Sequence, residues 1–205
     1  MMLSNRLAKH FGAAAAAALV VGSANAAIVT WNLNLVIPAN VDGAYINIAA
    51  QTTGTNSGVA GWDINPYGST TLNFFAPLSA PAPATTFVRT QATGGPSSLA
   101  VGTVIGAAST YANSTAAVVS ATGVGSNGWV ANAVNYFGFR FYNESTASIN
   151  YGYGAMQVGA TGGVRTLLTL AYEDTGGSIE AGAIPAPGAM ALLGLAGIAA
   201  RRRRR

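Results

Sequence analysis

Hydrophobic and polar residues alternate along several stretches of this chain. The clearest is YFGFRFYN at 136–143, where Phe137, Phe139 and Phe141 fall on one side of an extended chain. A period of two is the pattern of a half-buried β-strand, because successive side chains point to opposite faces of a sheet. The same period predicts further strands at 148–158 and 164–172, separated by short polar and glycine-rich loops. Three such strands in succession predict an antiparallel meander.

In the third of these stretches the alternation assigns one face of the strand to five residues. They are Val164, Thr166, Leu168, Leu170 and Tyr172. Shorter runs rich in β-branched and aromatic residues precede the meander, between 28 and 91, and are bounded by Pro or by the Asp42-Gly43 turn. Runs of this kind are typical of strands joined by tight turns. The stretch 96–132 has no clear period and is compatible with a short helix or a loop, with a turn at 126–128.

The aromatic faces of the meander need a second layer to cover them. We therefore predict an all-β fold, an antiparallel β-sandwich of the jelly-roll or lectin-like kind, with about eight to ten strands. A closed barrel is the alternative arrangement.

The first 26 residues have a different pattern. Arg6 and Lys9 precede an apolar, alanine-rich run at 11–21, and a small-x-small site follows from Ala24 to Ala26. This order predicts a secretory signal peptide with a helical apolar segment, cleaved after Ala26. The expected division is a signal peptide at 1–26, a β-sandwich domain at 27–183 and a C-terminal segment at 184–205.

The C-terminal segment has three parts. It begins with Ile184, Pro185, Ala186, Pro187 and Gly188, continues as an apolar run to residue 200, and ends with Arg201, Arg202, Arg203, Arg204 and Arg205. Proline pushes the preceding residue towards extended geometry, so the start of this segment is expected to be extended. The apolar run predicts a short transmembrane helix, about 20 Å long against a bilayer core of about 30 Å, which snorkelling arginine stems can lengthen. The arginines would stay on the cytoplasmic side and stop transfer.

This layout resembles the PEP-CTERM sorting signal of bacterial exported proteins, in which a proline motif, a short apolar helix and an arginine cluster end the chain. The usual core of the family is Pro-Glu-Pro, whereas this chain has Pro185-Ala186-Pro187. The resemblance implies recognition by a membrane-embedded protease of the exosortase type and a transient stay in the inner membrane. It also implies delivery to the cell envelope, the cell surface or an extracellular polysaccharide matrix.

The composition of the central part excludes several classes of function. Between residues 27 and 184 there are three basic side chains, all arginine, and six acidic ones, a net charge of −3. A nucleic-acid partner is therefore not expected. The chain has no cysteine, and its only histidine and lysine, His10 and Lys9, lie in the signal peptide. Catalytic triads, Schiff bases and the usual zinc sites are thereby excluded, and we predict no cofactor and no enzyme activity.

Few residues remain as candidate sites. Glu173 and Asp174 are adjacent acids at the end of a predicted strand and are candidate calcium ligands, although a solvated turn explains them as well. Glu144 with Glu173 would make a glycosidase pair only if their carboxyl groups were about 5 Å apart. Asn113-Ser114-Thr115 and Asn143-Glu144-Ser145 match the acceptor pattern for N-glycosylation.

The three tryptophans, Trp31, Trp62 and Trp129, are candidates for stacking on sugar rings or for core packing. Two hypotheses follow for the function. In the first, the protein is an exported, non-enzymatic surface or matrix protein, sorted by its C-terminal segment and associated with exopolysaccharide. In the second, the β domain is a carbohydrate-binding module, with calcium as a candidate requirement. An enzyme is the least favoured alternative.

Overall fold

The computed structural model describes residues 27–77 and 85–184. These residues form thirteen β-strands and no helix, which confirms the all-β prediction for this part of the chain. None of them lies in a helix with the length and apolarity that a membrane span requires. The predicted signal peptide with its cleavage site, the sorting motif after Ile184, the membrane helix and the arginine cluster lie outside the described residues.

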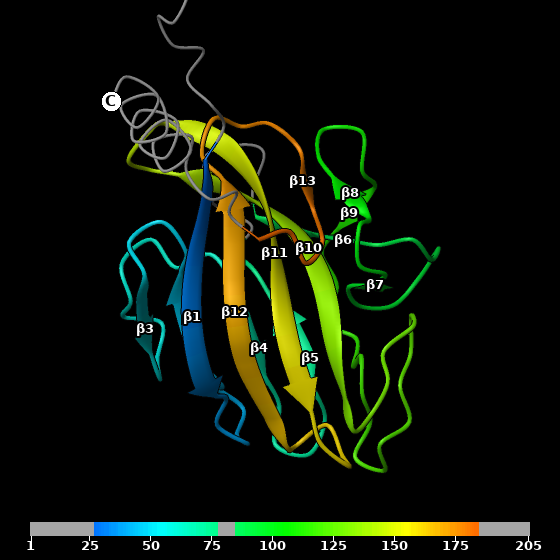
Figure 1. Cartoon of the computed structure of the whole chain (residues 1–205). Helices are drawn as coiled ribbons and strands as arrows, with labels where there is room; N and C mark the ends of the chain where they lie inside the picture. The colour runs from blue at the N-terminus through cyan, green and yellow to red at the C-terminus, as the bar shows by residue number, and fades with distance from the viewer. Residues whose placement is uncertain (1–26, 78–84, 185–205) are drawn as a thin grey trace, which may run out of the picture.

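An open antiparallel sheet of seven strands is the centre of the molecule (Figure 1). Its order is β1 (Ile28–Val36), β12 (Arg165–Glu173), β11 (Ser148–Val158), β10 (Ala133–Asn143), β6 (Thr86–Val88) and β9 (Tyr111–Ala112), and β7 (Ser98–Leu99) also pairs with β10. The predicted meander is confirmed, because β10, β11 and β12 are neighbours and β10 pairs with β11 along its whole length. The first strand of the chain pairs with the last long one, so residues far apart in sequence complete the sheet.

Shorter strands cover both faces of this sheet, which makes the arrangement sandwich-like. Behind it in Figure 1 lie β2 (Tyr45–Asn47), β3 (Thr52–Gly54), β4 (Asn65–Tyr67) and β5 (Asn73–Phe75). They form two antiparallel pairs, β2 with β3 and β4 with β5, and a bridge between Ile46 and Ile64 joins the two. On the front face lies a third pair, β8 (Val104–Ile105) with β13 (Ile179–Glu180).

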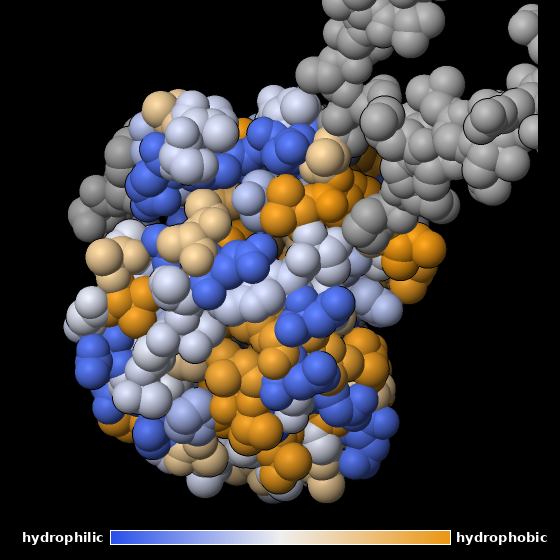
Figure 2. All heavy atoms as spheres, turned by 60° about the vertical axis from the view of Figure 1, so that its left-hand side comes forward, coloured by the Kyte–Doolittle hydropathy of each residue, from blue (hydrophilic) through white to orange (hydrophobic). Residues whose placement is uncertain are grey.

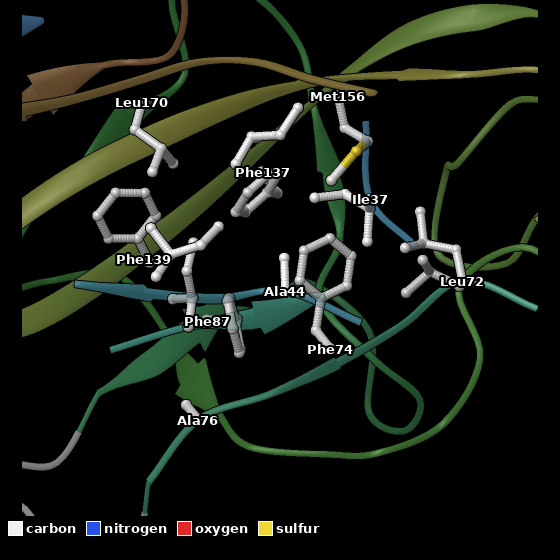
Figure 3. Packing of buried hydrophobic residues seen from close by; sticks show 14 of the residues in the cluster. Ile37, Ala44, Leu72, Phe74, Ala76, Phe87, Phe137, Phe139, Met156 and Leu170 are labelled. Carbon is white, nitrogen blue, oxygen red and sulfur yellow. The ribbon is translucent and has the colours of Figure 1, made fainter. Parts of the chain in front are cut away.

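The main core fills the space between the long sheet and the strands behind it. Phe137, Phe139 and Phe141 of β10 are all fully buried there, as their period of two predicts. Figure 3 shows Phe137 with Met156 facing Phe74 of β5, and the rings of Phe74 and Phe137 lie 4.9 Å apart. Burial of a side chain of this size stabilises the fold by about 1.5–3 kcal/mol, so the three phenylalanines fix which face of β10 points inwards.

The predicted face of β12 is wrong in its first half. Leu167 and Leu170 both belong to the buried core, so the alternation of inward and outward side chains changes between them. Ala155 of β11 pairs with Thr169 and Met156 pairs with Leu167, which leaves Leu168 as an extra residue. A bulge of this kind shifts the faces by one position. Leu168 therefore does not share the inner face with Leu170, as the sequence pattern predicted.

The bulge continues into β1, which is an edge strand of the sheet. The pairing of β1 with β12 shifts between Asn32 and Leu35, and Asn34 in this interval has a positive φ of 49°. Val36 and Val41, at and after the end of β1, are exposed. Figure 2 shows hydrophobic side chains gathered in the lower half of the face on which β1 and β3 lie. The bulge interrupts this edge, which hinders pairing with another chain.

The stretch 96–132 contains β7, β8, β9 and turns, and no helix. The turn predicted at 126–128 is present. Trp129 donates its amide hydrogen to the carbonyl of Ser126 (3.0 Å), and Asn127 and Gly128 have positive φ.

A buried arginine holds together the loops at one end of the sandwich. Arg165, at the start of β12, is only 2% exposed. Its Nη1 donates to the carbonyl oxygens of Thr71 and Gly162, and its Nη2 donates to those of Pro38 and Gly68, at 2.5–2.7 Å. Burial lowers the pKa of Arg165 to about 10, so the side chain stays charged at neutral pH. The four carbonyls take the place of a counter-ion.

Candidate functional site

The three tryptophans have different environments. Trp129 is buried and its Nε1 donates to the carbonyl of Pro96 (2.8 Å), so it is a core residue rather than a sugar-stacking one. Trp31 packs against the main core from β1. Trp62 is partly exposed, and its ring lies against Tyr45 (centroids 4.9 Å apart) and Phe75 (5.9 Å). Trp31 and Trp62 are both partly exposed, and of these two only Trp62 is not packed against the main core.

The two candidate calcium ligands are engaged in local hydrogen bonds. Glu173 is buried, and its Oε1 accepts from the amide (2.9 Å) and hydroxyl (2.7 Å) of Thr175, while the amide of Gly177 donates to its Oε2. Asp174 accepts a hydrogen bond from the amide of Ala27 (2.9 Å). Residues 27–77 and 85–184 contain no group of three or more His, Cys, Asp or Glu side chains arranged to hold a metal. Both acids stabilise the turn after β12.

A cavity of about 410 Å³ lies between three loops of the molecule. Its lining consists of Asn47, Ala49, Ala50, Ala60, Gly61, Glu144 and Ser145. These residues come from the turn after β2, from the segment before β4 and from the turn between β10 and β11. The volume lies within the range of ligand-binding pockets, about 300–1,000 Å³.

Asn47 positions two of the three loops. Its Oδ1 accepts from the amide of Ala50 (2.8 Å), and its Nδ2 donates to the carbonyl of Ala60 (3.0 Å). Gly61 follows with a positive φ of 60°, and a Cβ added there would lie 2.8 Å from both Asn47 Nδ2 and Glu144 Oε1. Glycine is thus required both by the backbone and by the closeness of the Glu144 carboxylate.

The third loop presents Glu144. The buried Asn143 accepts hydrogen bonds through its Oδ1 from the amide (3.0 Å) and the hydroxyl (2.6 Å) of Ser145. This closes the turn, and it leaves the Asn143 side chain enclosed rather than open to glycosylation. Glu144 is exposed, and its carboxylate makes no hydrogen bond to the described residues. It is therefore the free charged group at the rim of the cavity.

Asp63 is a buried acid coupled to this rim, and no sequence pattern singled it out. It is 3% exposed, its Oδ2 accepts from the amide of Ile48 (2.8 Å), and its Oδ1 lies 3.5 Å from the hydroxyl of Thr85. Burial raises the pKa of Asp63 to about 7, against the opposing effect of the Ile48 amide, and the negative charge of Glu144 raises it further. A large fraction of Asp63 is thus protonated near neutral pH.

The structure brings together a different pair of acids from the one that the sequence suggested. Glu144 acts electrostatically on Asp63, whereas the Glu173 carboxylate is held within its own turn. The only sign in the sequence that Asp63 is buried is its position between the apolar residues Trp62 and Ile64. No family model, no curated protein and no solved structure matches this chain. Its function is therefore inferred from its own residues and their geometry.

Proposed function

We propose that this protein is an exported, non-enzymatic surface or matrix protein, sorted by its C-terminal PEP-CTERM-like segment and associated with exopolysaccharide. The observation that carries the proposal is the order of the chain: a signal-peptide pattern, an all-β domain, and then a Pro-Ala-Pro motif, an apolar run and five arginines. An exosortase-type protease of the inner membrane would be the processing partner. The mature protein would reside in the cell envelope, at the surface or in the matrix.

The positions of the strands support processing at both ends. β1 begins at Ile28, two residues after the predicted cleavage at Ala26, and β13 ends at Glu180, before the proline motif at Pro185. Cleavage at these places would leave every described strand intact. Removal of the first 26 residues would turn the amide of Ala27, which donates to Asp174 Oδ1 at 2.9 Å, into a charged amino group beside a carboxylate. The mature amino end would then gain an ion pair at the end of the sheet.

The test is the intact mass of the protein recovered from its native host, from cells and from the medium. The proposal expects a species that starts at Ala27 and ends near Pro185–Gly188, with any extra mass showing a covalent attachment. Recovery of a species that still carries Arg205 would contradict sorting by cleavage and would indicate a plain tail-anchored domain. A variant in which Arg201–Arg205 are replaced by serine is the matched control for the wild type. It lacks the stop-transfer charges but keeps the proline motif.

A second function, carbohydrate binding by the β domain, is favoured by the cavity and by Trp62. The cavity has walls of small apolar residues, and the partly exposed Trp62 follows the lining residue Gly61 in the chain without lining the cavity itself. Sugars commonly bind with their C–H faces on such apolar and aromatic surfaces. Retention on immobilised host polysaccharide, lost in Trp62→Ala and kept in Tyr142→Ala, would support this function. Equal retention of both variants, or no retention of the wild type, would contradict it.

A further inference from the structure

The cavity bounded by Asn47, Gly61 and Glu144 has a free carboxylate and few free side-chain donors. Asn47 uses one of the two N–H groups of its Nδ2 for the carbonyl of Ala60, and the hydroxyl of Ser145 donates to Asn143. The carboxylate of Glu144 makes no hydrogen bond to the described residues. A ligand that matches the Glu144 carboxylate has to bring donors of its own, because an unmatched polar group loses its hydration without compensation.

The charges around the cavity have one sign. Glu144 is at the rim and the buried Asp63 lies close enough to be affected by its charge. No basic side chain is among the lining residues. Arg165 is held by four carbonyls near the start of β12, and Arg140 donates to Thr86 and lies over the ring of Tyr111 (4.6 Å). A carboxylated, sulfated or phosphorylated sugar would therefore meet a like charge and no partner.

The rest of the wall is apolar and made of small residues. Ala49, Ala50, Ala60 and Gly61 present methyl groups and backbone, and the polar lining residues are Asn47, Glu144 and Ser145. Such a surface suits a ring with an apolar C–H face and a donor-rich, positively charged substituent at one edge. A charge-assisted hydrogen bond from an ammonium group to a carboxylate is roughly twice as strong as a neutral one.

We propose that this cavity binds the amino-sugar unit of a polysaccharide that carries a free, protonated amine, with the Glu144 carboxylate accepting from the ammonium group. Ala49, Ala50 and Ala60 contact the C–H face of the ring. The inference rests on the carbohydrate-binding function proposed above and specifies its ligand class. A cationic polymer also complements the net charge of −3 of residues 27–184.

Calorimetric titration of the full chain in detergent tests this proposal with three oligosaccharides of equal length: glucosamine with free amines, neutral glucose and galacturonic acid. The expected order is glucosamine over glucose, with no binding of galacturonate. Glu144→Gln should weaken glucosamine binding by at least about tenfold and leave glucose binding nearly unchanged. Glu180→Gln is the matched control, because Glu180 is an exposed acid of β13 on the other face of the sheet, and it should have no effect.

Ala50→Leu gives a second, independent variant. Ala50 is exposed, so a larger side chain there fills the cavity without entering the core, and all oligosaccharide binding should be lost while the unfolding transition is kept. Tighter binding of galacturonate, equal binding of glucosamine to Glu144→Gln, or stronger binding of an oligolysine peptide would each overturn the proposal. Binding of galacturonate would leave the carbohydrate-binding function standing, whereas binding of none of the sugars would remove both.

Discussion

Two buried ionisable groups lie towards opposite ends of the sandwich, and they are hydrogen-bonded to very different extents. At the end where β12 begins, Arg165 donates to four carbonyl oxygens, which belong to the loop after β1, the loop between β4 and β5, and its own turn. Towards the other end, marked by the turn between β10 and β11, Asp63 has one short hydrogen bond, from Ile48, and one at the limit of contact, from Thr85. Arg165 therefore keeps its charge at neutral pH, whereas Asp63 is partly neutralised.

This difference separates a structural role from a candidate functional one. A buried charge with several hydrogen bonds fixes the segments around it, and its removal leaves several groups without a partner. A buried acid that is poorly solvated titrates near neutral pH, and such groups cluster at functional sites. Asp63 is buried near the cavity, and its pKa responds to the charge of Glu144 at the rim. Ligand chemistry is therefore expected at the cavity and not around Arg165.

The largest expected effect is from Arg165→Met. The change removes the guanidinium and leaves four carbonyl oxygens without this donor, two of them on the buried Gly68 and Gly162, so we expect the free energy of unfolding to fall by about 3–5 kcal/mol. Arg165→Lys should be intermediate, because one ammonium group cannot reach all four carbonyls. Urea unfolding measures both, with Arg140→Met as the control for loss of a half-buried arginine. If Arg140→Met lowers the free energy of unfolding as much as Arg165→Met, then the four hydrogen bonds from Arg165 to carbonyls are not what stabilises these loops.

The second effect is a pH dependence due to Asp63. Its pKa is about 7 in the folded protein and about 3.9 when unfolded, so the folded state favours the protonated acid. Its contribution to stability is fully present below pH 4 and is lost as the pH rises to 7, by up to about 4 kcal/mol. Unfolding measured from pH 4 to pH 8 should show this loss in the wild type, and Asp63→Asn should abolish it. If Asp63→Asn keeps the same dependence of the free energy of unfolding on pH, another group causes that dependence.

A third, smaller effect compares two glycines that both have positive φ. Gly61→Ala places a Cβ 2.8 Å from Asn47 Nδ2 and Glu144 Oε1, whereas Gly102→Ala meets nothing within 4 Å. Both should lose about 1–2 kcal/mol from the left-handed backbone, and Gly61→Ala should lose about 1 kcal/mol more from crowding. Thermal unfolding measures the difference. When Glu144 is also replaced by Ala, the additional loss of stability caused by Gly61→Ala should become smaller. If this additional loss is unchanged, Glu144 does not lie over Gly61.

The smallest effect concerns the electrostatic coupling between Glu144 and Asp63. The negative charge of Glu144 raises the pKa of Asp63, so Glu144→Gln should move the midpoint of the Asp63 transition to lower pH. The carboxyl carbon resonance of Asp63, followed by NMR through a pH titration, reports this midpoint directly. Glu180→Gln should leave it in place. If the midpoint does not change in Glu144→Gln, the charge of Glu144 at the cavity rim does not affect the pKa of Asp63.

The accuracy of the sequence-based predictions follows the range of the interactions. β10 and β11 could be predicted because each has a strict period of two and pairs with its neighbour through a short turn. The face of β12 could not, because Leu168 bulges against two partner strands, and one of them, β1, lies more than 130 residues earlier. The turn at Ser126–Gly128 was local and was found. The four short strands of the second layer have too few residues each for a period to show.

The candidate site shows the same limit. The sequence offers Glu144 only a conditional partner, Glu173, and the oxygens of Glu173 are held by Thr175 and Gly177. Neither Asn47 nor Asp63 carries a local pattern, since their roles arise only where the loops after β2, before β4 and after β10 meet.

The sequence by itself determined the all-β class, the central meander and the absence of lysine, histidine and cysteine from residues 27–184, because alternation and composition are properties of the chain alone. Only the tertiary structure decided that Arg165 is a buried structural cation, that Trp129 is core while Trp62 is not, and that Asp63 titrates near neutral pH. Burial and hydrogen bonding to distant carbonyls and amides set those properties, and they exist only once the layers are packed.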